Sequence, residues 1–323
     1  MNEVYIEIIN SNDSNLYIPV AAGEISIESY RSSMPSKAVF NILKDEEINV
    51  GEGSEVRIYV DSNPLFKGYV FTKKRDKDGI IAITAYDQLR YLKNKGTYNF
   101  SGYTLSDVIR QIAMDYKIQC RDIENSGFIL SDFIKDDKTL IDIIQDAIDI
   151  TYENTGVLYV LFDDFGGLSL KRAEKMIAEY LAEDATAENF SYQSTIDSGT
   201  YNQIRLTLKG KKGIIQEYFK NDSSSIAKWG VLQYTGNIDD GEDGNAKADK
   251  LLGIHNSIQR KLSVSGAFGD LKVRAGSVIY VRTNKTGDIE LDEKMTVESC
   301  RHRFKGGVHT MDLSLKGGLI NSV

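Results

Sequence analysis

The stretch GSEVRIYVDSNPLFKGYVFTKKRDKDGIIAITAY, residues 53–86, decides how the fold of this chain is interpreted. Its β-branched and aromatic residues fall into runs bounded by the turn clusters DSNP and RDKDG, which is typical of short consecutive strands. In the last run Ile81 and Ile83 share one face, which is the period of a half-buried strand. The sequence before it has the same texture, so residues 1–95 are expected to form a first small, tube-like β-barrel domain. The expected strands of the stretch are 53–60, 66–75 and 80–85.

The same order of strands returns near the other end of the chain. In both places a strand led by Gly-Ser precedes a longer strand with a basic end, a glycine turn and an alternating strand. The second set is GSVIYV (276–281), KMTVESCRHR (294–303), Gly306-Gly307 and VHTMDLSL (308–315). This similarity predicts a second, related β-barrel domain over 191–323, with one helix inserted near 245–262.

The sequence between the two β regions changes its period. Thr104 with Asp107, and Thr139 with Asp142, are each spaced like a helix N-cap and its third helical residue. The apolar residues that follow each pair have helical spacing. Two strand-like runs, VLYVLF and LSLKRA, come next, so residues 96–190 are expected to form a middle α+β domain. The predicted fold is therefore mixed β with an α+β insertion, two small β-barrels flanking the middle domain.

Composition limits the classes of function. A net charge of −8 argues against broad electrostatic binding to nucleic acid or to an anionic membrane. No apolar run approaches the roughly 20 residues of a membrane-spanning helix, and the start MNEVYIEIIN lacks the pattern of a signal peptide. Cys120 and Cys300 form no C-x-x-C pair. We expect a protein made in the bacterial cytoplasm.

The segment Asp163-Asp164-Phe165-Gly166 contains the D-F-G triplet that holds magnesium in protein kinases. A kinase also needs an H-R-D segment, which this sequence lacks. The flanking runs VLYVLF and LSLKRA instead predict a hairpin whose glycines form the turn.

Two other segments invite a metal-site interpretation. In NIDDGEDGNAKADK (237–250), counting from Asp239, Gly241 and Lys250 occupy positions where a calcium loop needs Asp or Asn and a bidentate Glu. Cys300, His302 and His309 lie on adjacent predicted strands, but a structural zinc site normally takes four ligands. We expect these three side chains on the exposed face of a β domain. The sequence thus nominates no catalytic, cofactor-binding or metal-ligating residue, and no cofactor.

The segment GYTLSDVIRQIAMDYKI (102–118) resembles the first half of a peptidoglycan-binding LysM module, in which a capped helix follows a short strand. The second half, another helix closing onto a strand, is not clear. A cell-wall-binding module is therefore one alternative function for this chain, and a tail-associated cell-wall hydrolase is a second alternative.

The order of the pieces resembles the baseplate hub proteins of contractile phage tails, defective prophages and phage-tail-like bacteriocins. Six segments spread between residues 65 and 283 carry the resemblance, which is one of order and covers most of the chain. They are LFKGYVFTKKR (65–75), ITAYDQLRYLKNKGTYNFSGYTLSDVIRQIA (83–113), TLIDIIQDAIDITYENTGVLYVLFDDFGGLSLK (139–171), SGTYNQIRLT (198–207), IAKWGVLQYTGNID (226–239) and SVIYVRT (277–283).

The resemblance implies a structural protein without catalysis, a homotrimeric ring at the tip of the tail tube. Its implied partners are the tail tube protein, the spike protein, the tape-measure protein, and wedge or LysM-containing baseplate proteins. Three chains that each carry two similar β domains would present six near-equivalent units to a sixfold tube.

Overall fold

The computed structural model describes residues 3–32, 34–183, 188–210, 213–238, 241–282 and 291–318 of the chain. Its N-terminal region is built from strands that surround a core of aliphatic and phenylalanine side chains. These strands are β1 (Val4–Ile9), β2 (Leu16–Tyr17), β3 (Ile25–Tyr30), β4 (Lys37–Leu43), β5 (Glu55–Val60), β6 (Asn63–Arg75) and β7 (Ile80–Tyr86). The three strands expected within 53–86 are β5, β6 and β7, and they form an antiparallel meander.

The C-terminal region repeats this arrangement. Its strands are β13 (Ile177–Glu183), β14 (Asn189–Thr195), β18 (Gln259–Phe268), β19 (Val278–Arg282), β20 (Asp292–Lys305) and β21 (Val308–Lys316). The meander β19–β20–β21 corresponds to β5–β6–β7, and its last strand pairs with β18 just as β7 pairs with β4. Beyond these, β14 lies beside β18 as β3 lies beside β4. Five strands of each region therefore follow one order, whereas the next strand differs in direction, because β13 is parallel to β19 and β1 is antiparallel to β5.

The copies agree down to single hydrogen bonds. Gly53 and Gly276 both have positive φ, +81° and +89°, a conformation that glycine adopts without steric cost. The Gly53 N–H donates to the carbonyl of Val70, and the Gly276 N–H donates to the carbonyl of Val297. The next register shift in each long strand begins at that valine. The repeated Gly-Ser sequence thus marks the start of the same turn, and the repeated bulge fixes the same twist.

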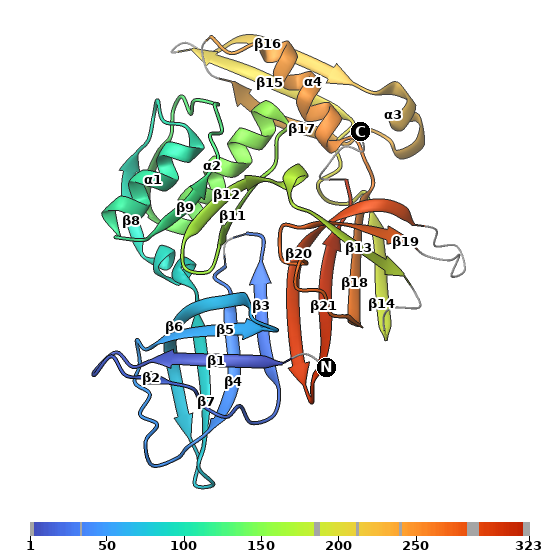
Figure 1. Cartoon of the computed structure of the whole chain (residues 1–323). Helices are drawn as coiled ribbons and strands as arrows, with labels where there is room; N and C mark the ends of the chain where they lie inside the picture. Colours follow the sequence, from blue (N-terminus) through green and yellow to red (C-terminus); the bar gives the residue numbers. More distant parts are fainter. Residues whose placement is uncertain are drawn as a thin grey trace.

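One sheet runs through both copies, because β20 is longer than its neighbour β19. Residues 292–296 of β20 pair with β19, whereas residues 299–304 pair antiparallel with β3. The join lies at the centre of Figure 1, where β3 stands next to β20. The two barrels expected from the sequence are not closed among the described residues. In the N-terminal region a single bridge, Ala21 to Ile42, brings the chain after β2 back against β4.

The middle region contains the two predicted helices. Its elements are the 3-10 helix η1 (Gln88–Lys93), β8 (Lys95–Asn99), α1 (Leu105–Asp115), β9 (Cys120–Ile123), β10 (Ile134–Thr139), α2 (Leu140–Thr155), β11 (Tyr159–Asp163) and β12 (Leu168–Arg172). Thr104 forms the predicted capping box with Asp107, each side chain bonded to the other's backbone N–H. Thr139 caps α2 in the same position by accepting from the Asp142 N–H, but this pair does not complete a capping box. Both helices bury their apolar stripes in one core.

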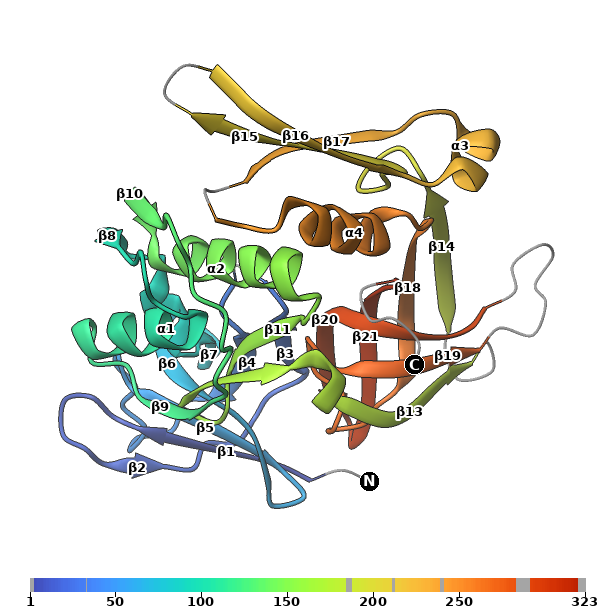
Figure 2. The same cartoon turned by 90° about the horizontal axis from the view of Figure 1, so that it is seen from above.

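The insertion into the C-terminal region is larger than the single helix expected near 245–262. It comprises β15 (Gln203–Gly210), β16 (Gly213–Asn221), α3 (Ser223–Trp229), β17 (Gln233–Ile238) and α4 (Gly244–His255). The three strands make a separate sheet with its own small core under α4. Seen from above, α4 lies between this sheet and α2 (Figure 2). The expected helix ends at His255, and the chain then enters β18.

Within the described ranges, none of the helices combines the length and the apolar character needed to cross a membrane.

Candidate functional site

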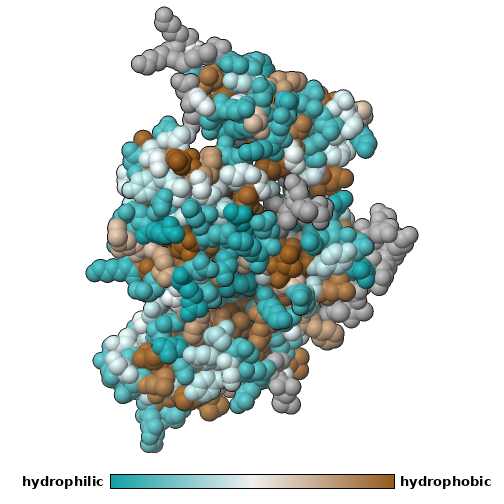
Figure 3. Space-filling model, turned by 45° about the horizontal axis from the view of Figure 1, so that its top comes forward, coloured by the Kyte–Doolittle hydropathy of each residue, from teal (hydrophilic) through white to brown (hydrophobic). Residues whose placement is uncertain are grey.

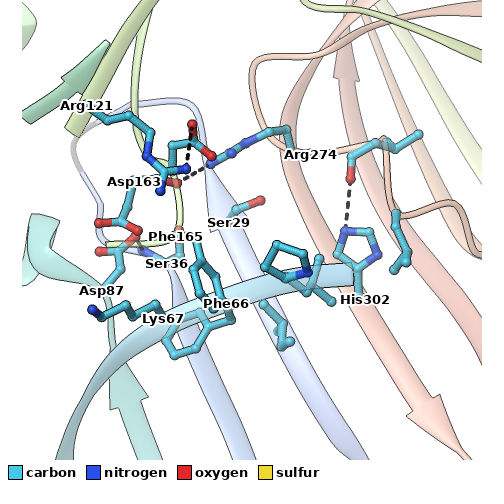
Figure 4. A pocket seen from close by; sticks show the side chains of 16 residues that line it. Ser29, Ser36, Phe66, Lys67, Asp87, Arg121, Asp163, Phe165, Arg274 and His302 are labelled. Carbon is cyan, nitrogen blue, oxygen red and sulfur yellow. Dashed lines mark hydrogen bonds and ion pairs between the residues drawn. The ribbon is translucent and has the colours of Figure 1, made fainter. Parts of the chain in front are cut away.

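A cavity of about 210 Å³ lies where the N-terminal, middle and C-terminal regions meet. Its walls come from β3 and β6, from the β11–β12 turn, and from the loop that leads into β19. Figure 4 shows Arg274 pointing from that loop toward Asp163, with Asp87 and Lys67 on the opposite side. We call this place the junction, because residues of all three regions line it.

Asp163 is held in place by the turn that the D-F-G segment forms. β11 and β12 pair antiparallel from Tyr159–Arg172 to Asp163–Leu168, so the predicted hairpin is confirmed. The Asp163 carboxylate accepts from the Gly166 N–H at 2.7 Å and from Gln88 Nε2 at 2.9 Å. Asp164 instead points toward Arg121, 3.5 Å away. The first aspartate therefore ties the hairpin to η1, and the second stays in a surface ion pair.

Arg274 ties the hairpin to the C-terminal region. Its Nη2 donates to the carbonyl oxygen of Asp163 at 2.9 Å, and its guanidinium lies 4.0 Å from the centre of the Phe162 ring. Such stacking of a cation on an aromatic face is attractive, and more so away from water. Burial lowers the pKa of Arg274, whereas the charges of the nearby aspartates raise it.

Asp87 supplies a second buried carboxyl at the junction. It caps η1 by accepting from the Leu89 N–H, and it accepts from the Ser36 N–H, both at 3.0 Å. Burial, and then the charge of Asp163, raise the pKa of Asp87 to about 8. Burial also raises the pKa of Asp163. Two carboxyls and one guanidinium thus share an enclosed space, and their protonation is linked to how the three regions pack.

Cys300, His302 and His309 come together, but not where the sequence analysis placed them. All three are buried, at 0%, 3% and 8% exposure, so the expected position on an exposed face is wrong. Alternation along a strand predicts two faces but not which of them a neighbouring segment covers. Here the loop carrying Val273 covers this face, and its carbonyl accepts from His302 Nε2 at 2.9 Å.

The two histidines form a neutral pair. Because His302 Nε2 donates to the Val273 carbonyl, His302 Nδ1 must accept, and its partner His309 Nε2 donates across 2.9 Å. Burial lowers the pKa of His302 to about 3 and that of His309 to about 4. Burial also raises the pKa of the Cys300 thiol. These groups pack the core as uncharged side chains. Among the described residues no cluster of three potential ligands is arranged to hold a metal ion.

The remaining segments singled out in the sequence have structural roles. Residues 239–240 of the calcium-loop-like segment lie outside the described residues. In the part that is described, Asp243 caps α4 and Lys250 donates to the Asn154 carbonyl, which joins the insertion to α2. Just before the LysM-like segment 102–118, β8 pairs with β10, and the strand after α2 pairs with β12 instead. The second helix therefore does not lead into a strand that closes onto β8.

The sequence did not single out three residues that make the junction, namely Asp87, Gln88 and Arg274. Nothing in their local sequence distinguishes Gln88 or Arg274, because their partners lie 75 and 111 residues away. Asp87 carried a usable signal, since an aspartate directly after a strand and before a helical turn is a common N-cap. Chemically, the junction can hold three regions in fixed relation.

The fold defines a class of protein, namely one with the fold of prophage tail proteins. The 43 kDa tail protein of prophage MuSo2 from Shewanella oneidensis shares the fold with a TM-score of 0.67 at 15% identity, covering 97% of this chain and 98% of that one. The Escherichia coli c3393 protein, described as a type VI secretion component similar to the T4 tail proteins gp27 and gp5, gives a TM-score of 0.55 at 7% identity. That match covers 96% of this chain and 75% of the other.

The chain belongs to the YQBQ-like family, whose model matches residues 25–316. Among curated proteins it is similar to the phage-like element PBSX protein XkdQ of Bacillus subtilis, with 29% identity over 320 residues. That alignment covers 96% of each chain. The resemblance to phage tail baseplate proteins drawn from the sequence is thereby confirmed.

Proposed function

We propose that this protein is the structural hub of a phage-tail-like baseplate, a homotrimeric ring that adapts a sixfold tail tube to a threefold spike. It acts by assembly and not by catalysis. Its partners are further copies of itself, the tube protein on one side and the spike on the other, with the tape-measure and wedge proteins as further contacts.

The single observation that carries the proposal is the duplicated β unit. β3–β4–β7–β6–β5 and β14–β18–β21–β20–β19 have the same order, the same Gly-Ser turn and the same bulge. Three chains with two such units each offer six similar surfaces, and a closed ring of this kind needs only one repeated contact. Within this proposal the segments 1–95, 96–190 and 191–323 act as first β unit, middle domain, and second β unit with its insertion.

The junction supports the same function mechanically. A hub that passes load between tube and spike needs its β units and middle domain to move as one body. The Asp163 carboxylate of the middle region accepts from Gln88 Nε2 of η1, and its carbonyl oxygen accepts from Arg274 Nη2 of the C-terminal region, both at 2.9 Å. Asp87, directly before η1, accepts from the Ser36 N–H of the N-terminal region at 3.0 Å, so hydrogen bonds inside the molecule, where water competes least, join all three regions.

The test is the mass of the purified chain, measured by light scattering alone and after mixing with the tube and spike proteins encoded beside it. We expect three copies, either alone or once a partner is present. A chain that stays monomeric in every mixture would overturn the proposal. Retention on purified peptidoglycan would favour a cell-wall-binding module, and clearing of a cell-wall gel would favour a hydrolase.

A further inference from the structure

The chain already contains one example of contact between its two β units. At this contact β3 and β20 are antiparallel neighbours, with Glu28 opposite Arg301 and Ile27 opposite His302. An ion pair of 2.9 Å joins Glu28 to Arg301. The loop before β19 adds a bond, from the Ala275 N–H to the side chain oxygen of Ser29. The contact is head-to-tail, because it uses the β3 edge of one unit and the β20 edge of the other.

Each unit also has the edge that the other unit uses in this contact. Counted from the shared bulge, residues 72–75 of β6 correspond to residues 299–302 of β20. Residues 191–195 of β14 correspond to residues 26–30 of β3, since both series pair with equivalent positions of β18 and β4. Each of the two edges that meet inside the chain therefore has an equivalent in the other β unit: β6 repeats the edge of β20, and β14 repeats the edge of β3.

These second edges have no strand partner among the described residues. The ladder between β5 and β6 ends at Tyr69, so residues 72–75 pair on one side only, with β7. β14 likewise pairs only with β18. The two edges lie on opposite sides of the molecule, with β14 at the right of Figure 1 and β6 at the left.

We propose that β14 of one copy pairs antiparallel with residues 72–75 of β6 in a second copy, continuing the sheet from chain to chain. The register follows from the contact inside the chain: Gln193 lies opposite Lys74, and Thr195 lies opposite Thr72. The inference rests on the proposed ring and deepens it by naming the surface through which its copies bind. Backbone hydrogen bonds supply the main attraction, as in other cases of strand addition.

The side chains at these edges fit the proposed pairing. The Gln193 amide oxygen replaces the Glu28 carboxylate as an acceptor, and Lys74 replaces Arg301 as the donor. Tyr192 packs against the core of its own unit, as Ile27 does in the other, and Arg75 of the second copy would lie opposite it. Tyrosine with arginine is a favourable cross-strand pair.

The loop before β5 lies against β6 in the same way as the loop before β19 lies against β20. Lys73 Nζ donates to the carbonyl of Val50 at 2.6 Å, and the equivalent Cys300 lies against the carbonyl of the equivalent Val273. The loop that supports the β3–β20 contact thus has a counterpart beside residues 72–75. Lysines at an exposed edge discourage pairing with unrelated strands, which would restrict the edge to a partner that provides acceptors.

The face of the molecule seen in Figure 3 offers no broad apolar area for a partner to bury. On the face seen in Figure 3, hydrophobic residues form small separate groups among hydrophilic ones. A head-to-tail contact repeated with the same rotation closes a ring when the rotation divides a full turn. Three chains then provide six contacts, three inside chains and three between them.

Disulfide trapping tests the register. Residues directly opposite in antiparallel strands have Cα atoms about 4.5–5.5 Å apart, which a disulfide can span. In a Cys120→Ser background, the pairs Gln193→Cys with Lys74→Cys and Thr195→Cys with Thr72→Cys should link neighbouring chains on mild oxidation. The matched control Gln193→Cys with Thr72→Cys is two residues out of register and should link at least tenfold less.

A second control uses the contact inside the chain. Glu28→Cys with Arg301→Cys should form the same bond within one chain and leave its mass on a non-reducing gel unchanged. Circular dichroism and the native mass of every variant are compared with the wild type, with and without tube and spike proteins. Two- and three-chain species from both in-register pairs support the inference.

Other outcomes separate the two proposals. Folded variants that are trimeric by native mass but unlinked, or linked equally out of register, overturn this interface and leave the proposed function standing. A chain that stays monomeric with its partners overturns both. If one in-register pair unfolds the protein, the other decides.

Discussion

Replacing Arg274 with methionine removes a buried guanidinium from the junction while keeping most of its side-chain volume. The variant loses the 2.9 Å bond to the Asp163 carbonyl and the stacking on Phe162 at 4.0 Å. It also leaves Asp87 and Asp163 without their nearby positive charge. All three effects weaken the contact between the middle and C-terminal regions.

The size of the effect can be worked from these contacts. A hydrogen bond from a charged donor contributes roughly 1.5–3 kcal/mol, and the ring contact adds about 0.5–1 kcal/mol. Removing the desolvation cost of the guanidinium offsets part of this loss. We expect a net destabilisation of about 2–3 kcal/mol at pH 8. The exposed Arg121, 3.5 Å from Asp164, is the matched control, and Arg121→Met should change stability by less than about 0.5 kcal/mol.

The stability difference between Arg274→Met and the wild type should depend on pH. The pKa of Asp87 is about 8 in the folded protein, above its ordinary value of 3.8, so its protonated form contributes stability that is lost as pH rises between these values. Without Arg274 the ionised carboxyls cost more, so the gap between variant and wild type should widen from pH 5 to pH 8. Urea unfolding followed by circular dichroism measures both. Equal losses of unfolding free energy in Arg274→Met and Arg121→Met would show that Arg274 does not stabilise the junction. A difference between Arg274→Met and the wild type that narrows with rising pH would show the same.

Two further predictions concern the core and the repeated turn. His302 and His309 have lowered pKa values of about 3 and 4, so their contribution to stability is lost as pH falls below about 6.5. His309→Gln should therefore flatten the fall in unfolding free energy between pH 6.5 and pH 4.5, and an unchanged slope would contradict the neutral pair. Gly53→Ala should cost about 1–2 kcal/mol from backbone strain alone, because its new Cβ meets nothing closer than 3.9 Å. Gly276→Ala should cost more, since its Cβ would lie 2.5 Å from Val160 Cγ1; thermal melting of the two variants compares them, and equal losses would argue against that close approach.

The sequence predicted those parts of the fold that local chemistry determines. Thr104 and Thr139 begin helices because a side chain oxygen at that position satisfies a free N–H. The Gly-Ser pairs begin equivalent strands because only glycine adopts the required positive φ without strain. These signals lie within a few residues of the structure that they produce, so they can be recognised without knowing which distant segment packs against them.

What the sequence did not predict depends on distant segments. β3 and β20 pair because β20 extends beyond the end of its ladder with β19. The paired residues of β3 and β20 are more than 260 positions apart in sequence. The residues of β15, β16 and β17 were expected to belong to the second β-barrel, with only a helix inserted. They form a separate sheet instead, whose core under α4 requires β15 and β17 to pair in parallel. The burial of His302 depends on the loop at Val273, which the strand pattern does not place.

An electron cryomicroscopy map of the assembled baseplate would show directly whether the chain forms the proposed ring. We expect three chains in which N-terminal and C-terminal β units alternate around the axis, with β14 of each chain beside β6 of the next. A ring of six chains, or one in which the two β units of a chain are stacked along the axis, would contradict it.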